Sequence, residues 1–257
     1  MMRSSSSLVL LCTCAFGFLV ADDLSSVQKK HLNDVFVESG ATATGSAISS
    51  AWQAGYKKIY MIDANSVLVK HAEYLFTTYF DMAPTWRPVA FADWKPELHF
   101  VLGNSVSDLG NIIKNVHVPI TFFLHSYRAS PDEVDATNNI LMELEQIRQH
   151  HVKTHVILID NIDLAGTPLF GNVTLNEVLV WLQSINPNYV FTFSDGGHLG
   201  KRSNALLTAF VPSTMEPQGR VIGRANRVVT AIKRKGKKCL SYFIRVLGGT
   251  PKSGKGT

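Results

Sequence analysis

The segment that most constrains the fold is residues 35–45, where an apolar run meets a glycine-bearing loop. The run ends at the acid Glu38, and the loop extends from Gly40 to Gly45. Beyond it, apolar residues recur at helical spacing until Gly55, where a C-cap is expected. A strand, a glycine turn and a helix open nucleotide-binding α/β domains, because glycine lets the backbone approach a ligand and the helix N-terminus offers N–H groups. A plain strand-to-helix connection has the same local pattern.

A second apolar run, residues 58–63, ends in another acid, Asp63. It follows the loop at about the twenty-residue spacing at which a carboxylate reaches a ribose hydroxyl. Two strand ends with acids at this spacing favour a nucleoside site over a plain connection.

Three further apolar runs, residues 99–104, 119–125 and 154–160, alternate with helical patterns. Continuous apolar strands separated by helices are typical of a parallel sheet covered on both faces. Two later runs, 189–194 and 204–211, are expected to add an antiparallel pair. Ligands of such sheets bind outside the carboxyl ends of the strands. The polar residues at those ends are Glu38, Asp63, Asn104, Ser105, His125, Asp160 and Asn161.

Helix starts are also readable. Asn65 is expected to cap the helix after the second strand. Two capping boxes are expected, one made by Ser105 with Asp108 and one by Thr174 with Glu177.

The N-terminus is typical of a secretory signal peptide, which we place at residues 1–21. Arg3 and a serine run precede an apolar stretch too short for a membrane-spanning helix, although an uncleaved signal anchor is an alternative. The protein is therefore expected to be secreted or to reside in the lumen of the secretory pathway. In that compartment Asn172 lies in a glycosylation sequon, which would make the chain a glycoprotein.

Charge divides the rest of the chain into a domain, residues 24–212, and a basic tail, residues 213–257. The whole chain has 25 Lys and Arg and 20 Asp and Glu, and the tail holds eleven of the former and a single acid, Glu216. Residues 1–212 therefore carry 14 basic residues against 19 acids. The tail pattern predicts a basic amphipathic helix that contacts an anionic membrane surface or a polyanion, or else a solvated tail. Nucleic acid is not an expected partner of a secreted chain.

Four motifs lie at the strand ends: Val37-Glu-Ser-Gly40, Leu102-Gly-Asn-Ser105, Phe122-Phe-Leu-His125 and Ile157-Leu-Ile-Asp-Asn161. In their order, these motifs resemble class I S-adenosylmethionine-dependent methyltransferases, from about residue 33 to residue 212. The closest resemblance is to a branch with macrocin-like sugar O-methyltransferases. The resemblance implies a three-layer Rossmann-like α/β fold, with a seven-stranded, mostly parallel sheet in the order 3-2-1-4-5-7-6 and helices on both faces.

The resemblance also implies that S-adenosylmethionine is the cofactor. Glu38 and Gly40 would flank its methionine part, Asp63 would bind the ribose, and Asn104 with Ser105 would lie at the adenine. Family members with a metal site use a carboxylate after the fourth strand and the acidic pair after the fifth.

In this chain His125, Asp160 and Asn161 would be the metal ligands and the catalytic residues. The ion would hold two acceptor oxygens and lower the pKa of the attacking hydroxyl.

The chain departs from the family pattern at three positions. Asn104 replaces an Asp, and Gly45 is displaced by one residue, which leaves Thr44 where a positive φ is wanted. His125 also replaces an Asp, and imidazole is a poorer Mg²⁺ ligand that suits softer ions. His125 is alternatively a general base, or the remnant of a lost metal site.

Two functions follow as hypotheses. One is methyl transfer from S-adenosylmethionine to a hydroxyl of a small molecule or glycan, with a sugar as the candidate acceptor. The other is a non-catalytic binding module that keeps the fold. The predicted compartment favours the second, because S-adenosylmethionine is made in the cytosol.

Overall fold

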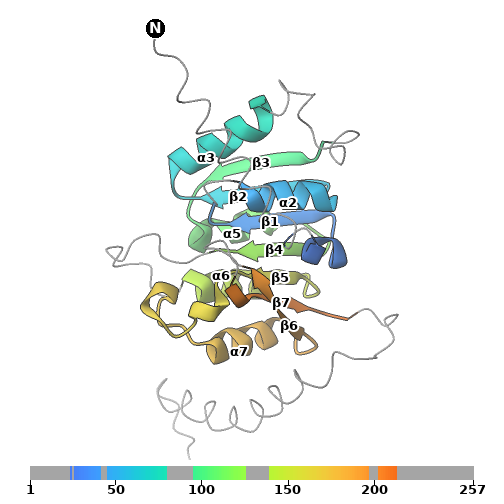
Figure 1. Cartoon of the computed structure of the whole chain (residues 1–257). Coiled ribbons are helices and arrows are strands. Elements are labelled where there is room, and N and C mark those ends of the chain that lie inside the picture. The colour runs from blue at the N-terminus through green and yellow to red at the C-terminus, as the bar shows by residue number, and fades with distance from the viewer. Residues whose placement is uncertain are drawn as a thin grey trace, which may run out of the picture. The chain divides into compact units, whose positions relative to one another are not determined.

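Seven strands form one sheet in the computed structural model, which describes residues 24, 26–41, 45–79, 95–125, 139–196 and 202–212 (Figure 1). The strand order is β3-β2-β1-β4-β5-β7-β6. The first five strands are parallel, and β7 is antiparallel to both β5 and β6. This order and these directions confirm the predicted α/β fold. The strands are β1 (Val35–Ser39), β2 (Lys58–Asp63), β3 (Glu97–Leu102), β4 (Ile120–Leu124), β5 (Val156–Ile159), β6 (Val190–Gly196) and β7 (Arg202–Phe210).

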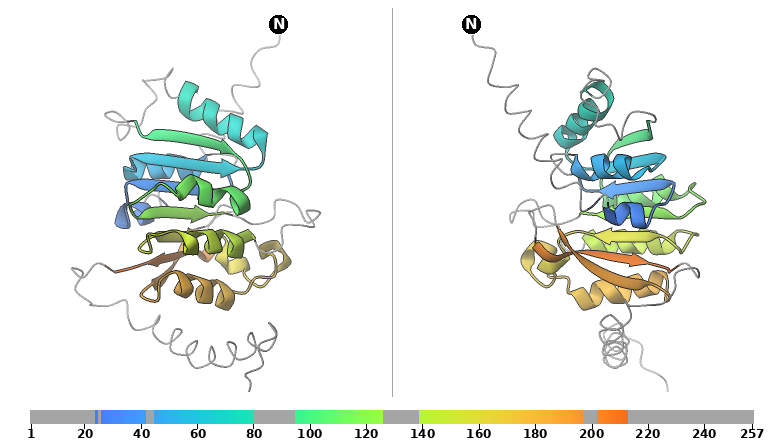
Figure 2. Two further views of the ribbon diagram at one scale, coloured as in Figure 1. Left: turned by 180° about the vertical axis from the view of Figure 1, so that it is seen from behind. Right: turned by 45° about the vertical axis from the view of Figure 1, so that its right-hand side comes forward.

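Helices cover both faces of the sheet (Figure 2). On one face α5, α6 and α7 lie side by side, and α2 lies on the opposite face against β1 and β2. α3 packs against β2 and β3 and continues as a π-helix, η1. The helices are α2 (Ser46–Ala54), α3 (Ser66–Glu73), η1 (Tyr74–Tyr79), α5 (Ser105–Ile113), α6 (Asn139–Gln149) and α7 (Leu175–Ile185), with 3₁₀ turns η4 (Ile162–Leu164) and η5 (Pro168–Phe170).

The three central strands β1, β4 and β5 are buried at every residue, whereas the edge strand β3 is only partly covered. This difference follows from the layers, since a central strand has a neighbour on each side and helices on both faces. One core cluster fills the face under α2 and joins side chains from β1, β2, β4, β5 and β7. Its largest members include Phe36, Trp52, Tyr56, Phe76 and Phe123.

Two predicted helix starts are confirmed. The side chain of Asn65 accepts hydrogen bonds from the backbone N–H groups of Val67 and Leu68 and caps α3. Thr174 and Glu177 form a reciprocal capping box at the start of α7. Each cap satisfies backbone donors that the first turn leaves without a helical partner.

The predicted cap of α5 was wrong by one residue. Asn104, in extended conformation, is the N-cap, and its Oδ1 accepts from Val106 N–H at 2.9 Å. Ser105 is instead the first helical residue. Asp108 still reaches back, because its Oδ2 accepts from the N–H of Asn104 at 2.9 Å. Either residue type suits an N-cap, so the sequence alone does not fix the register.

Several predictions fall outside the described residues. They are the signal peptide at residues 1–21, the basic tail at 213–257, and Thr44. Contacts divide the chain into residues 1–212 and 213–257, and the described residues all belong to the first unit. Within them, every helix is too short or too polar to cross a membrane.

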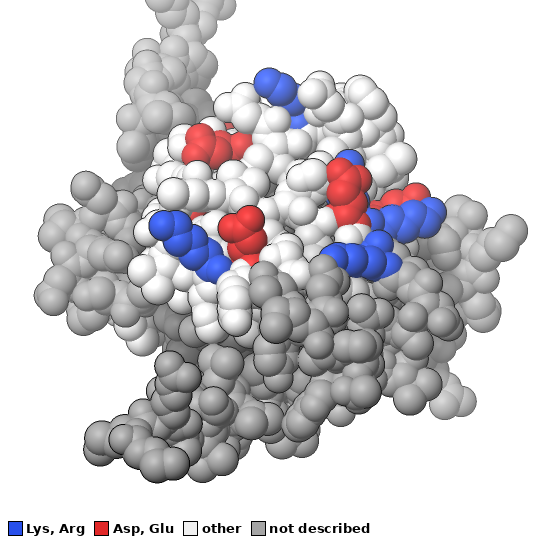
Figure 3. All heavy atoms as spheres, turned by 90° about the horizontal axis from the view of Figure 1, so that it is seen from above, with Lys and Arg blue, Asp and Glu red and all other residues white. Residues whose placement is uncertain are grey.

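Acidic and basic side chains are interspersed on the surface beside α3 and β3 (Figure 3). On this edge Lys58 Nζ lies 2.8 Å from Glu97 Oε2, and His99 Nε2 lies 2.6 Å from Glu97 Oε1. Among the described residues this face therefore has mixed rather than single-sign charge.

Candidate functional site at the carboxyl ends of the strands

The carboxyl ends of five parallel strands lie in one row. The residue that follows each of β1, β3, β4 and β5 donates its backbone N–H to the end of a neighbouring strand. These bonds place the predicted site residues along one edge of the sheet, as the rule for open α/β sheets requires. The four bonds run from Gly103 to Asp63 O (3.0 Å), Gly40 to Ile62 O (3.0 Å), His125 to Ser39 O (2.9 Å) and Asp160 to Leu124 O (3.1 Å).

The loop after β1 needs glycine at two positions. Gly40 has φ +82°, and a Cβ there would lie 2.9 Å from the carbonyl oxygen of His125. Gly45 has φ +63°, and a Cβ there would lie 2.7 Å from Phe76 Cε2. Gly45 is the residue before α2, so the left-handed turn at the helix start is made by this displaced glycine. Thr44 lies outside the described residues.

Asp63 joins the ends of β1 and β2. Its Oδ2 accepts from the N–H of Ala41 at 2.6 Å, and its Oδ1 accepts from the N–H of Asn65 at 2.6 Å. A carboxylate has about four lone-pair positions, so each oxygen keeps capacity for a ligand hydroxyl. The side chain is half-buried and fixed beside the glycine loop.

Asn104 is exposed beyond β3, and its side-chain oxygen is committed to the cap of α5. Its amide NH₂ group makes no hydrogen bond within the described part of the chain. An adenine ring placed here would therefore meet a donor from Asn104 and the first turn of α5, which Ser105 opens.

Glu38 is fully buried near the end of β1, level with Met61 on β2 and Phe123 on β4. Burial disfavours the charged form of a carboxylate that lacks a partner, and Glu38 does have an interaction partner.

A second buried acid was missed in the sequence. Glu143 on α6 is fully buried and accepts a hydrogen bond from the hydroxyl of Ser39 at the end of β1. The available signal was position, because Glu143 lies on the same helical face as the buried residues Ile140 and Leu144.

His125 and Asp160 come together as predicted. Nε2 of His125 lies 3.4 Å from Oδ2 of Asp160, and the side chains are 5% and 2% exposed. A carboxylate at this distance stabilises positive charge on the imidazole, and the effect is stronger in a buried site. The two side chains thus form a buried pair where β4 and β5 end.

Asn161 is buried in a left-handed conformation with φ 57°. Its Nδ2 donates to Oδ2 of Asp160 at 3.1 Å, and its Oδ1 accepts from Nη2 of Arg202. Arg202 opens β7 and also lies 3.2 Å from Oδ1 of Asp163. Arg202 has no specific signal in the sequence, because it precedes the predicted start of its strand.

A fixed cation lies beside the three predicted metal ligands. The oxygen of Asn161, the atom through which its amide would bind a divalent ion, accepts a hydrogen bond from the guanidinium of Arg202. Across the residues described, no group of three or more His, Cys, Asp or Glu side chains is arranged to hold a metal, and the predicted set, which includes an asparagine, is not such a group. The metal site at His125, Asp160 and Asn161 therefore stays a prediction, with the guanidinium of Arg202 as a competing cation.

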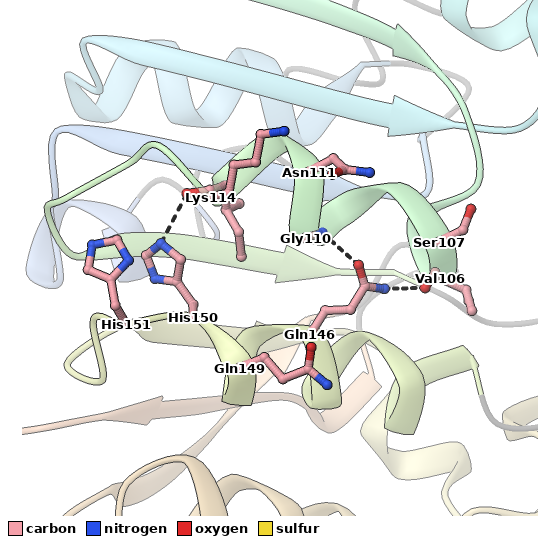
Figure 4. Close-up of a pocket in the computed structure, with 10 residues that line it drawn as sticks. Val106, Ser107, Gly110, Asn111, Lys114, Gln146, Gln149, His150 and His151 are labelled. Atoms are coloured by element: carbon pink, nitrogen blue, oxygen red, sulfur yellow. Dashed lines mark hydrogen bonds between the residues drawn. The ribbon is translucent and has the colours of Figure 1, made fainter.

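A hollow of about 580 Å³ lies elsewhere, between α5 and α6 (Figure 4). Gln146 crosses it, accepting from Gly110 N–H at 2.6 Å and donating to the carbonyl oxygens of Ser105 (3.0 Å) and Val106. None of the predicted site residues lines this hollow, so we do not assign it to the candidate site. Its lining residues are Val106, Ser107, Gly110, Asn111, Ile113, Lys114, Gln146, Gln149, His150 and His151.

Comparisons with known proteins give a structural likeness only. No protein-family model and no curated protein matches the chain. It is similar to the solved structure of an O-methyltransferase from Bacillus cereus in complex with SAH, at 14% identity and TM-score 0.47, over 82% of this chain and 93% of that one.

Two other solved structures are similar at comparable values. One is an SAH-bound methyltransferase from Podospora anserina, at 11% identity and TM-score 0.46, over 79% of this chain and 88% of that one. The other is a spermidine synthase from Thermotoga maritima, at 12% identity and TM-score 0.44, over 79% of this chain and 61% of that one. These values assign the chain to no family, and the fold rests on its own strand order.

Proposed function

We propose that this chain binds S-adenosylmethionine at the carboxyl ends of β1, β2 and β3 and transfers its methyl group to a hydroxyl acceptor. The proposal rests on the row of strand ends. In this row the loop at Gly40, the carboxylate of Asp63 and the amide of Asn104 lie on the same edge of the sheet as the His125–Asp160 pair. The four strand-end motifs support the same assignment by resemblance.

The residues present suit this cofactor. Asp63 keeps one acceptor position on each oxygen for the ribose hydroxyls, and the amide of Asn104, with Ser105 beside it, offers a donor to adenine. Glu38 and Gly40 flank the remaining part of the proposed site. When bound, S-adenosylmethionine supplies an electrophilic methyl group on a sulfonium sulfur.

The chain's own contribution to the reaction is to move a proton. With an acceptor hydroxyl beside His125, the imidazole would take up the hydroxyl proton when the oxygen is methylated. The carboxylate of Asp160, 3.4 Å from Nε2, would stabilise the resulting imidazolium. Asn161 donates to the same carboxylate oxygen and fixes its orientation.

A second function has one observation in its favour. His125 and Asp160 are almost fully buried, which restricts the approach of an acceptor. A protein that keeps the fold and binds a ligand without methyl transfer would tolerate this burial.

The compartment, the acceptor and the role of the tail rest on the sequence. The signal peptide supports secretion or a lumenal location, where the sequon at Asn172 would be glycosylated. The motif resemblance supports a sugar or another glycan as the acceptor. The charge of residues 213–257 supports contact with an anionic membrane surface or a polyanion.

A methyl-transfer assay tests the catalytic proposal. The purified chain is incubated with methyl-labelled S-adenosylmethionine and a panel of hydroxyl acceptors that includes sugars, with and without EDTA. We expect transfer that is unchanged by the chelator and that falls about 10²–10⁴-fold in His125→Gln, the usual contribution of a general base. Absence of transfer from a chain that binds the cofactor would favour the binding protein, and full activity of the variant would contradict the role of His125.

A further inference from the structure

Five side chains form a continuous polar network from the end of β4 to the start of β7. His125 faces Asp160, and Asp160 accepts from Asn161. The amide oxygen of Asn161 in turn accepts from Arg202, which is also paired with Asp163. A metal ion beside three of these residues was one of the hypotheses drawn from the sequence, and the structure places the guanidinium of Arg202 there.

We propose that the guanidinium of Arg202 takes the place of a divalent ion in this site and makes it independent of metal. The catalytic part of this inference rests on the proposed function, whereas the exclusion of ions does not. Arg202 does not touch the reacting atoms in this account and acts by positioning Asn161.

Charge and geometry carry the argument. A guanidinium keeps its charge at every physiological pH and presents several N–H donors in a fixed plane. Nη2 of Arg202 contacts Oδ1 of Asn161 and also lies 3.2 Å from Oδ1 of Asp163. An incoming divalent cation would have to displace this donor from the amide oxygen and withstand the repulsion of its positive charge.

The same contacts orient the amide of Asn161. An amide has one oxygen and one nitrogen end, and Arg202 holds the oxygen. The NH₂ group is thereby left to donate to Asp160, at 3.1 Å, and to hold its carboxylate beside His125. Arg202 thus orients Asn161, as a bound ion would, but it does not contact the acceptor.

The test is Mn²⁺ binding to four forms of the full chain, measured by loss of the free Mn²⁺ electron paramagnetic resonance signal. The forms are the wild type, His125→Asp, Arg202→Met and the double variant. His125→Asp restores a hard carboxylate ligand, and Arg202→Met removes the cation at similar length. We expect the double variant to bind Mn²⁺ at least tenfold more tightly than the wild type, His125→Asp or Arg202→Met.

Two controls keep the result interpretable. His125→Asp with Arg202→Lys retains a positive charge and is expected to bind no Mn²⁺, and Arg148→Met removes an exposed arginine that pairs with Glu145 away from the site. Arg202→Gln replaces the methionine variant if thermal melting followed by circular dichroism shows that the latter is unfolded.

Either of two outcomes overturns the inference: equal binding by His125→Asp and the double variant, or no binding by the double variant. Because the measurement uses no methyl donor, neither outcome bears on whether the chain binds S-adenosylmethionine. Failure of this inference and failure of the proposed function are therefore distinguishable.

Discussion

Gly40 lies where two constraints coincide, a left-handed φ of +82° and the carbonyl oxygen of His125 at 2.9 Å from any added Cβ. We predict that Gly40→Ala costs about 1–2 kcal/mol for the backbone conformation and about 1–3 kcal/mol more for the overpacking. Urea unfolding of the variant and the wild type measures the loss.

Gly166 provides a matched control, because it has φ +85° and no atom within 4 Å of an added Cβ. Gly166→Ala is expected to cost only the backbone part. Equal losses at the two positions would contradict the close approach of the β1 loop to His125.

Asp63 is the residue on which cofactor affinity should depend most directly. We predict that Asp63→Ala weakens binding of the demethylated cofactor by about 1–3 kcal/mol, because a charged hydrogen-bond acceptor is removed. Isothermal titration calorimetry measures the change. Asp34→Ala, which removes an exposed partner of Lys57, should leave affinity unaltered, and an equal effect of the two variants would rule out a specific role for Asp63.

The positions of single site residues were predictable where the residue directly follows a strand. His125 and Asp160 are examples, because their side chains do lie next to each other. The roles of Asn161 and Arg202 were not predictable, because their contact joins segments 41 residues apart through side-chain geometry. Glu143 was missed for a related reason, since a sequence pattern does not distinguish an acid at the margin of a buried stripe from one inside it.

At the level of helices, the capping box of α7 makes a prediction that does not depend on the site. Thr174→Ala removes the acceptor for Glu177 N–H and should lower the free energy of unfolding by about 0.5–2 kcal/mol. Chemical denaturation checks this value. Asn176→Ala, an exposed change in the same first turn, is expected to have little effect, and a comparable loss there would contradict the capping assignment.

Two buried histidines join α5, α6, β4 and β5 on the side opposite the candidate site. Nδ1 of His155 accepts from Ile120 N–H at 3.1 Å, so its proton is on Nε2 and faces Nδ1 of His150 at 3.0 Å. Nε2 of His150 then donates to Ile113 O at 3.0 Å. All four ring nitrogens of His150 and His155 therefore take part in hydrogen bonds, and both rings are neutral.

Burial, reinforced by neighbouring His150, lowers the pKa of His155 from 6.5 to about 3, and burial also lowers the pKa of His150. Below pH 6.5 the unfolded chain therefore binds a proton at His155 that the folded chain does not. We predict that the free energy of unfolding falls by roughly 2–3 kcal/mol when the pH is lowered by about two units from 6.5. Urea unfolding across this range measures the slope.

His155→Gln removes the titrating group and keeps a donor and an acceptor, so its stability should depend less steeply on pH. A slope equal to that of the wild type would contradict the assignment of neutral, buried rings.

Strand positions were predicted better than strand ends. The second strand was placed at its observed bounds, Lys58–Asp63, because an acid terminates the apolar run. The third was placed two residues late, since Glu97 opens β3 although its side chain is exposed and polar. Its hydrogen-bonded neighbour β2, rather than its own composition, holds Glu97 in the sheet.

For the whole molecule, the alternation of apolar runs and helices predicted a mostly parallel sheet covered on both faces, whereas the strand order was predicted only through the resemblance of the strand-end motifs. The function depends on which ligand binds at the strand ends. The alternation of apolar runs and helices does not identify that ligand. The glycine and acid positions predict a nucleoside-containing cofactor, and the polar network around Arg202 lies beside the proposed acceptor side of the site.

The most direct test of this account is titration of the purified chain with S-adenosylhomocysteine by isothermal calorimetry. The account predicts saturable binding at one site per chain, weakened in Asp63→Ala and retained in Asp34→Ala. No heat of binding by the folded wild-type chain, or binding that Asp63→Ala leaves unchanged, would contradict the assignment of the strand ends as the cofactor site.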